Sequence, residues 1–127
     1  MSHPPGRHTV EPKREEDLVF KSAAEWFGLL STPVRLKIIR AVCNGERNAS
    51  ELLAQIDTTQ PHMSQHLATP YRAGVLGKRR EGRQIYQRLQ SERVAALCRA
   101  ACTQVAVELD GAEGVPAAER LIRAVHR

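Results

Sequence analysis

The sequence predicts a mainly α-helical domain with one small β-hairpin. Apolar residues recur at helical spacing over most of the chain, and two extended runs flank a single Glu-Gly dipeptide. The length of 127 residues suits one hydrophobic core. Only 4% of the residues are aromatic, so Leu, Ile, Val and Ala must build that core. Such a core favours helices, and a helical protein this small often completes its burial by dimerising.

The two ends of the chain differ from its middle. Residues 1–14 are polar and rich in proline, so we expect a disordered N-terminal tail. Residues 15–110 carry the periodic apolar pattern and should form the single domain. Residues 111–127 are a predicted C-terminal helical extension, because Gly111 should break the preceding helix and Pro116 can open a shorter one.

The first two predicted helices meet at a capped corner. Apolar residues recur at helical spacing over residues 17–30, which predicts an amphipathic first helix. Thr32 can cap the free amides of the second helix, and Pro33 suits the first helical position. We expect the second helix to run to about Asn44, where Gly45 provides a natural stop.

A short helix, a tight polar turn and a longer helix are predicted next. Residues 48–51, with the sequence Asn-Ala-Ser-Glu, match a capping box and indicate the start of the third helix. Residues 57–59 form the turn. The fourth helix should begin near Gln60, tolerate Pro61 in its first turn and end at Gly74.

A β-hairpin and a fifth helix complete the predicted domain. Residues 75–80 and 83–89 form two extended runs around Glu81-Gly82, which indicates a hairpin. Ser91 can then cap the fifth helix, whose apolar stripe continues to Leu109.

A short helix, a turn and a second helix with a polar leading face form the arrangement of a helix-turn-helix DNA reader. The first turns of such a second helix enter the major groove, where hydrogen-bonding side chains are needed. The expected DNA contacts on this helix are Gln60, His62, Ser64, Gln65 and His66. Met63 and Leu67 fall on the opposite side and should face the core. His62 and His66 are four residues apart, a spacing that can bind zinc, but on this helix we favour DNA contact and predict no metal site.

The predicted hairpin concentrates positive charge. The net charge is +5, and a basic surface favours a polyanion because each neutralised phosphate releases counterions. The cations gathered at the hairpin are Lys78, Arg79, Arg80 and Arg83. Alone, this run would indicate a solvated turn. Behind a helix-turn-helix pattern, it predicts contact with the backbone or minor groove of double-stranded DNA.

Other classes of protein fit the sequence less well. It has no Gly-rich phosphate loop, no paired carboxylates in an apolar setting and no nucleophile motif, so we predict neither an enzyme nor a cofactor. A module that only dimerises or binds protein is the remaining alternative, but its hairpin would not need four cations. No apolar run approaches the roughly 20 residues that span a bilayer, and no signal peptide is evident. We therefore expect a cytoplasmic protein with no membrane partner and with reduced cysteines.

Four stretches resemble the ArsR/SmtB repressors. They are LSTPVRLKII at residues 30–39, SQHL at 64–67, RAGVL at 72–76 and RREGRQIY at 79–86. The resemblance covers roughly residues 17–109 and implies a winged helix-turn-helix homodimer that packs through its first and fifth helices. It also implies binding to an imperfect palindromic operator, with release when a small inducer binds. Two-fold symmetry would place the two recognition helices about one DNA turn apart.

One position departs from the resemblance. Family members usually carry Leu or Met where this chain has Pro70. Proline inside a helix removes one hydrogen bond and clashes with the carbonyl four residues earlier, here that of His66. We therefore expect the fourth helix to kink, or to end early, near Thr69. The DNA-reading residues precede this point, so DNA binding should survive.

The resemblance implies a sensor for metals, metalloids, reactive sulfur or oxidants. The positions of the zinc- and cobalt-sensing site on the last helix align with Ser91, Arg93, Gln104 and Val107, so that site is absent. The cysteine pair of the arsenic type is also absent, because the third helix contains no cysteine. The residues that remain as effector or redox candidates are Cys43, Cys98 and Cys102.

The persulfide-sensing branch of the family pairs cysteines at positions that align with Arg40 and Ala106. Cys43 lies one turn after the first position and Cys102 one turn before the second, so in antiparallel helices the two shifts compensate. This implies release by thiol chemistry with reactive sulfur or an oxidant.

Two alternatives to thiol chemistry stay open. Cys43, Cys98 and Cys102 could hold a soft ion such as arsenite or antimonite as three thiolates. They could instead be small apolar core residues, because all three lie on apolar stripes.

Overall fold

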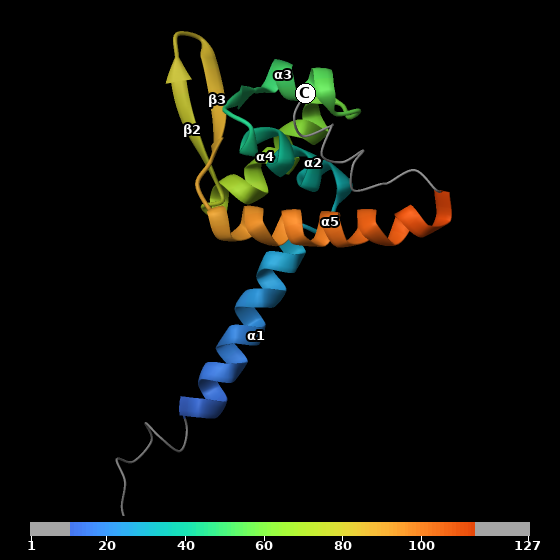
Figure 1. Cartoon of the computed structure of the whole chain (residues 1–127). Helices are drawn as coiled ribbons and strands as arrows, with labels where there is room; N and C mark the ends of the chain where they lie inside the picture. Colours follow the sequence, from blue (N-terminus) through green and yellow to red (C-terminus); the bar gives the residue numbers. More distant parts are fainter. Residues whose placement is uncertain (1–10, 114–127) are drawn as a thin grey trace, which may run out of the picture.

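The computed structural model of the chain describes residues 11–113 (Figure 1). The elements are α1 (Glu11–Leu29), α2 (Pro33–Cys43), β1 (Arg47–Asn48), α3 (Ala49–Gln55), α4 (Gln60–Arg72), β2 (Leu76–Glu81), β3 (Gln84–Leu89) and α5 (Glu92–Glu113). The predicted mainly α-helical fold with a small hairpin is confirmed. No helix within residues 11–113 has both the length and the apolar character needed to cross a membrane.

Polar caps start the helices where the sequence predicts. The Thr32 hydroxyl accepts a hydrogen bond from the Arg35 amide at 3.1 Å at the start of α2. At α3, the Asn48 side chain accepts from the Glu51 amide at 2.8 Å, and Glu51 accepts from the Asn48 amide at 2.9 Å. These bonds satisfy amides that have no partner inside the helix, and they fix the point at which each helix begins.

The sheet has three antiparallel strands in the order β1-β3-β2. The hairpin of β2 and β3 turns at Gly82, whose φ of 62° favours glycine. Strand β1, which pairs Arg47 with Gln87 of β3, was not predicted from the sequence. A strand of two residues has no alternation to detect, and its second residue also caps α3.

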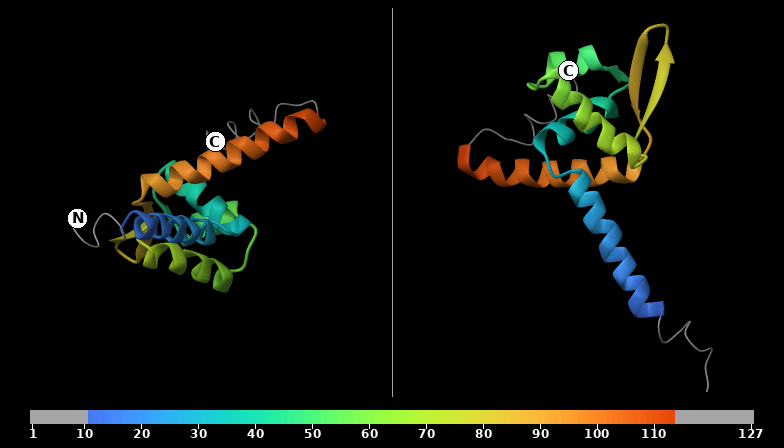
Figure 2. Two further views of the ribbon diagram at one scale, coloured as in Figure 1. Left: turned by 90° about the horizontal axis from the view of Figure 1, so that it is seen from below. Right: turned by 180° about the vertical axis from the view of Figure 1, so that it is seen from behind.

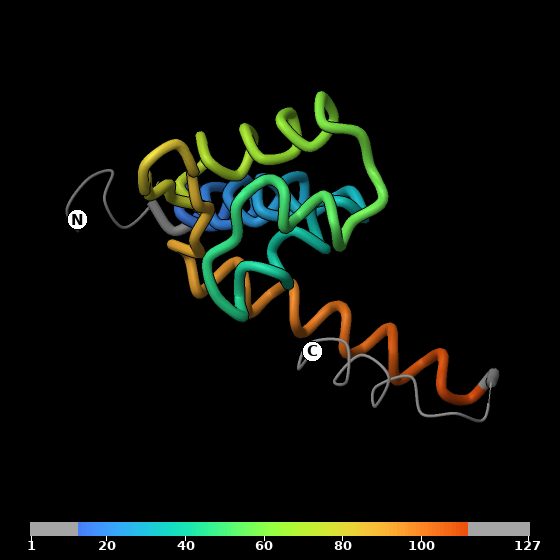
Figure 3. The backbone as a smooth tube through the Cα atoms, turned by 90° about the horizontal axis from the view of Figure 1, so that it is seen from above, coloured from blue at the N-terminus to red at the C-terminus, as the bar shows by residue number. Residues whose placement is uncertain are grey.

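Two hydrophobic clusters share α2 as their centre. The first joins α2 to α3, α4 and β2 through residues that include Ile38, Leu52, Met63 and Leu76. The second joins α2 to α5 and includes Ile39, Val94, Ala95 and Cys98. The left view of Figure 2 and the tube in Figure 3 accordingly show α4 and α5 on opposite sides of α2. Any change in the packing of α2 therefore reaches both outer helices.

Helix α1 projects away from the rest of the domain in Figure 1 and in the right view of Figure 2. Its large apolar side chains are mostly solvent-exposed in a single protomer, with Phe20 at 68% and Phe27 at 59%. The later turns of α5 also expose Val105 and Leu109, at 53% and 50%. Apolar surface of this extent marks an interaction site. It matches the predicted homodimer, which packs through the first and fifth helices.

Three expected boundaries differ from the structure. Helix α1 begins at Glu11, so residues 11–14 of the expected tail are helical, whereas residues 1–10 lie outside the described part. Helix α5 passes through Gly111 and ends at Glu113. One glycine costs a helix only about 1 kcal/mol relative to alanine, which is too little to end a long helix. The rest of the expected extension, residues 114–127, lies outside the described residues.

The expected early end of α4 at Pro70 is wrong, because the helix continues to Arg72. The Ala73 amide donates to the Thr69 carbonyl at 3.1 Å, so helical hydrogen bonding resumes directly after the proline. Pro70 itself is fully buried and occupies a core position. The packing of the apolar face of α4 thus compensates for the one hydrogen bond that proline removes.

Candidate DNA-binding surface

Helix α4 presents its polar flank to solvent. Met63 and Leu67 are 1% and 7% exposed and anchor the helix to the core, as predicted. The Thr59 hydroxyl caps the helix by accepting from the His62 amide at 3.3 Å. Of the side chains predicted to contact DNA, those that are solvent-exposed are Gln60, His62, Ser64 and Gln65. His66 differs, because it is half-buried.

His66 contacts a cation that the sequence analysis did not select. Its Nδ1 lies 3.4 Å from Nη1 of Arg35 on α2. Partial burial, the nearby Arg35 guanidinium and His62 together lower the pKa of the His66 imidazole. The same guanidinium also binds the end of α1, where its Nε donates to the Leu29 carbonyl at 2.7 Å. Arg35 therefore joins the end of α1 to α4.

At the base of the hairpin, two of the four predicted cations are held by other side chains. Arg79 Nη1 donates to Glu81 at 2.6 Å, and its Nε donates to Glu46 at 2.7 Å. The hydrogen bonds to Glu81 and then to Glu46 raise the pKa of the Arg79 guanidinium. Arg79 also lies 4.9 Å from the centre of the Tyr86 ring. With two carboxylate partners, Arg79 has little charge left for a phosphate.

Lys78 is held by an aromatic ring. Its Nζ lies 4.1 Å from the centre of the Tyr71 ring on α4. This contact joins the hairpin to the end of α4. Neither Tyr71 nor Glu46 was predicted from the sequence, because no local signal marks either residue as a partner of a cation in the hairpin.

The two cations at the tip of the hairpin have a different environment. Arg80 lies opposite Ile85, and Arg83 follows Gly82 in the turn. Both side chains are exposed, and neither makes a hydrogen bond or an ion pair with any residue between 11 and 113. The tip cations are therefore available to a polyanion.

The structure brings Cys43, Cys98 and Cys102 together between α2 and α5, and all three are free thiols. Cys98 is buried, with Cys43 and Cys102 packed against its cluster. Burial raises the pKa of Cys98 to about 12, and the neighbouring Cys102 and Cys43 thiols add to the increase. Burial also raises the pKa of Cys43, although Nη1 of Arg99, 3.8 Å from its sulfur, opposes that effect. At neutral pH the thiols of Cys98 and Cys43 are therefore mainly protonated.

Within the described residues, no three or more His, Cys, Asp or Glu side chains are placed to hold a metal ion. The three thiols therefore do not form a ready-made metal site in one protomer. His62 and His66 likewise have no third ligand in this part of the chain.

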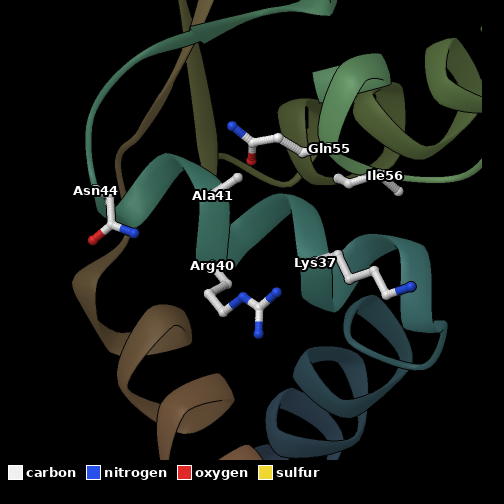
Figure 4. Close-up of a pocket in the computed structure, with 6 residues that line it drawn as sticks. All are labelled: Lys37, Arg40, Ala41, Asn44, Gln55 and Ile56. Atoms are coloured by element: carbon white, nitrogen blue, oxygen red, sulfur yellow. The ribbon is translucent and has the colours of Figure 1, made fainter. Parts of the chain in front are cut away.

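A separate pocket of about 240 Å³ lies beside α2 (Figure 4). Lys37, Arg40 and Asn44 line it from α2, and Gln55 and Ile56 line it from the end of α3. Arg40, where the resemblance described above implies a cysteine in the persulfide-sensing branch, lines this pocket. Cys43, one turn later, instead packs in the cluster with Cys98.

Residues 32–77 match the family model described as "Bacterial regulatory protein, arsR family". The biofilm growth-associated repressor of Xylella fastidiosa strain Temecula1 is 36% identical over 104 residues, which cover 76% of this chain and 90% of that protein. The structure also resembles the crystal structure of the transcriptional repressor BigR from Xylella fastidiosa. Their TM-score is 0.65 at 32% identity, with 72% of this chain and 93% of that one covered.

A third comparison concerns the fold. The solution structure of the homodimeric winged helix-turn-helix DNA-binding domain Mb0332 from Mycobacterium bovis has a TM-score of 0.61 at 23% identity. It covers 86% of this chain and 92% of that one. The fold, the apolar faces of α1 and α5, and the family match lead to the same conclusion. This chain belongs to the ArsR/SmtB family of winged helix-turn-helix transcriptional repressors, which bind DNA as homodimers.

Proposed function

We propose that this repressor is released from its operator when the thiols of Cys43, Cys98 and Cys102 react with reactive sulfur species or an oxidant. The observation that carries this proposal is the packing of the three free cysteines, from two different helices, into one cluster. Because α2 is shared by both hydrophobic clusters, a bond formed at its last residue is well placed to disturb α4.

The chemistry needs two cysteines that react one after the other. One thiolate attacks the outer sulfur of a small persulfide, which forms a protein persulfide and releases the small thiol. A second thiolate attacks the protein-bound sulfur and expels HS⁻, which leaves a disulfide. With hydrogen peroxide, the first thiolate gives a sulfenic acid and hydroxide, and the second cysteine displaces water to give the same disulfide. A bond between Cys43 and a cysteine of α5 would link two helices that are otherwise only packed together.

We propose that the polar flank of α4 contacts the bases and so recognises the DNA sequence, and that the hairpin tip contacts the DNA backbone. The exposure of Gln60, His62 and Gln65 supports the first role. The exposed Arg80 and Arg83 support the second. Lys78 and Arg79, which we predicted as contacts, are better suited to holding the hairpin in place, since their partners are already within the protein.

A DNA footprint upstream of the repressor's own gene identifies the operator, and band-shift assays then test release. The reduced protein should bind, and a small persulfide should release it. Cys43→Ser should stay bound under the same treatment. Of Cys98→Ser and Cys102→Ser, one should still permit release, because the disulfide to Cys43 needs only one cysteine of α5. Arsenite provides the arm for a metalloid sensor. If none of the three Cys→Ser variants changes release by persulfide, peroxide or arsenite, the cysteines do not sense.

A further inference from the structure

The guanidinium of Arg35 makes contacts in two directions. Toward α1, its Nη2 donates to the Gly28 carbonyl at 3.1 Å and to the Ser31 hydroxyl at 3.2 Å, and its Nε donates to Leu29. Toward α4, its Nη1 meets Nδ1 of His66 at 3.4 Å. The contacts with α1 hold the guanidinium in one orientation, so its remaining edge faces His66.

This geometry decides which nitrogen of His66 carries the proton. A guanidinium has only N–H donors, offers no acceptor and keeps its charge in proteins. Nδ1 of His66 must therefore accept through its lone pair, which leaves the hydrogen on Nε2. A proton on Nδ1 would point at a cation, and an imidazolium there would meet like charge. The lowered pKa of His66 agrees with a neutral ring.

We propose that Arg35 is a positioning residue that fixes the Nε2–H tautomer of His66, so that the recognition helix offers DNA a hydrogen-bond donor at this position. The two nitrogens lie on opposite edges of the ring, and the half-buried His66 has Nδ1 turned toward α2. Nε2–H then suits an acceptor, either on a base edge, such as N7 or O6 of guanine, or on a phosphate. This inference rests on the proposed role of α4 in DNA contact.

The tautomer can be tested without DNA. Long-range nitrogen–hydrogen NMR spectra of ¹⁵N-labelled protein distinguish protonated from unprotonated ring nitrogens. We expect Nε2 of His66 to be protonated and Nδ1 to be unprotonated. In Arg35→Leu, the two tautomers should become mixed. Ser31→Ala removes another contact of the same guanidinium and serves as the matched control, so it should leave the His66 spectrum unchanged. A protonated Nδ1 in the unaltered protein would overturn the inference.

Two amide substitutions then test the donor in DNA binding. In His66→Gln the side-chain amide can occupy the position of Nε2–H, whereas in His66→Asn it lies nearer to Nδ1. We expect Gln to retain most of the operator affinity and Asn to lose roughly tenfold, as for one lost hydrogen bond. Circular dichroism of both variants checks that the fold is intact. Equal affinities of the two variants would contradict the proposal. The operator affinities of the His66 variants can be measured even if Arg35→Leu does not fold.

The acceptor on DNA can be identified with modified operators. Replacing a guanine with 7-deazaguanine removes its N7 acceptor, and a methylphosphonate neutralises a single phosphate. The modification that abolishes the difference between His66→Gln and His66→Asn identifies the acceptor. If neither modification abolishes it, N7 of guanine and the phosphates are excluded as acceptors. Failure of the unaltered protein to bind any operator would overturn the proposed function, while the NMR result would still decide the tautomer.

Discussion

The base and the tip of the hairpin carry the same charge but place it in different surroundings. At the base, Lys78 lies over a tyrosine ring and Arg79 is held between two carboxylates. At the tip, Arg80 and Arg83 are exposed, without an ion pair to any described residue. The comparison teaches that a run of cations in a sequence does not measure the charge available to a phosphate. Part of that charge attaches the hairpin to the protein.

The largest expected effect is on the tip. Replacing both Arg80 and Arg83 with alanine should weaken DNA binding on every sequence, because both side chains are assigned to phosphates. The dependence of log affinity on log salt should become shallower by about 3.6, since the homodimer loses four tip arginines and each phosphate contact contributes about 0.9. Fluorescence anisotropy over a salt series measures this slope. The thermal unfolding midpoint should not change, and an unchanged slope would remove these two residues from the DNA-binding surface.

The next largest effect is expected at the base of the hairpin, where a substitution should lower stability and not DNA binding. Arg79→Met should keep the salt dependence of DNA binding but lower the thermal stability, because Glu46 and Glu81 lose their shared partner. Glu46→Gln should lower stability in the same direction by less, since Arg79 retains Glu81. Thermal unfolding followed by circular dichroism provides the measurement. If Arg79→Met flattens the salt slope as much as Arg80→Ala does, base and tip do not differ.

Local signals explain why much of the fold was predictable. The capping box at Asn48, the proline in the first turn of α2 and the glycine of the hairpin each fix an element boundary within a few residues of chain. The outward flank of α4 followed from helical spacing. These features depend on neighbours in the sequence, and the structure confirmed them.

The parts that sequence reasoning missed depend on distant partners. Glu46 and Arg79 are 33 positions apart, and Arg35 and His66 are 31 apart. Strand β1 exists only because β3 lies beside it. Pro70 was misjudged because its cost is local, whereas the burial that compensates for it comes from the whole core. Pairings of this kind appear only when the fold is known.

A smaller effect is expected at the junction between the hairpin and α4. Tyr71→Leu removes the ring beneath Lys78 but keeps an apolar side chain. The loss should be about 0.5–1 kcal/mol, as for an exposed cation–π contact. Urea denaturation of this variant, of Lys78→Met and of the double variant isolates the coupling between the two residues. Additive losses would mean that Lys78 gains nothing from the ring and belongs with the tip cations.

The smallest expected effect is a pH dependence of the free energy of unfolding that arises from the cysteine cluster and not from the hairpin. The arginines stay charged, but the pKa of Cys98 rises from 9.0 to about 12 on folding. The folded protein then holds a proton that the unfolded chain releases, so this contribution to stability is full well below pH 9 and falls as pH rises through 9 toward 12. Between pH 8 and pH 9 the loss should be about 0.4 kcal/mol. Cys98→Ala should lack this component in urea titrations, and the same slope in both proteins would refute the assignment.

Because α1 projects from a single protomer, the concentration of the protein should itself affect its binding to the operator. Most of the stability of a helix in a protein comes from the packing of its apolar face, so in a lone protomer the projecting N-terminal turns of α1 would unwind readily. The carbonyls of Gly28 and Leu29 that orient Arg35 lie at the opposite, anchored end of α1. Dilution would therefore loosen helix α1 without any chemical stimulus. When protomers predominate, the paired form grows with the square of the total, so halving gene dosage would cut operator occupancy by more than half.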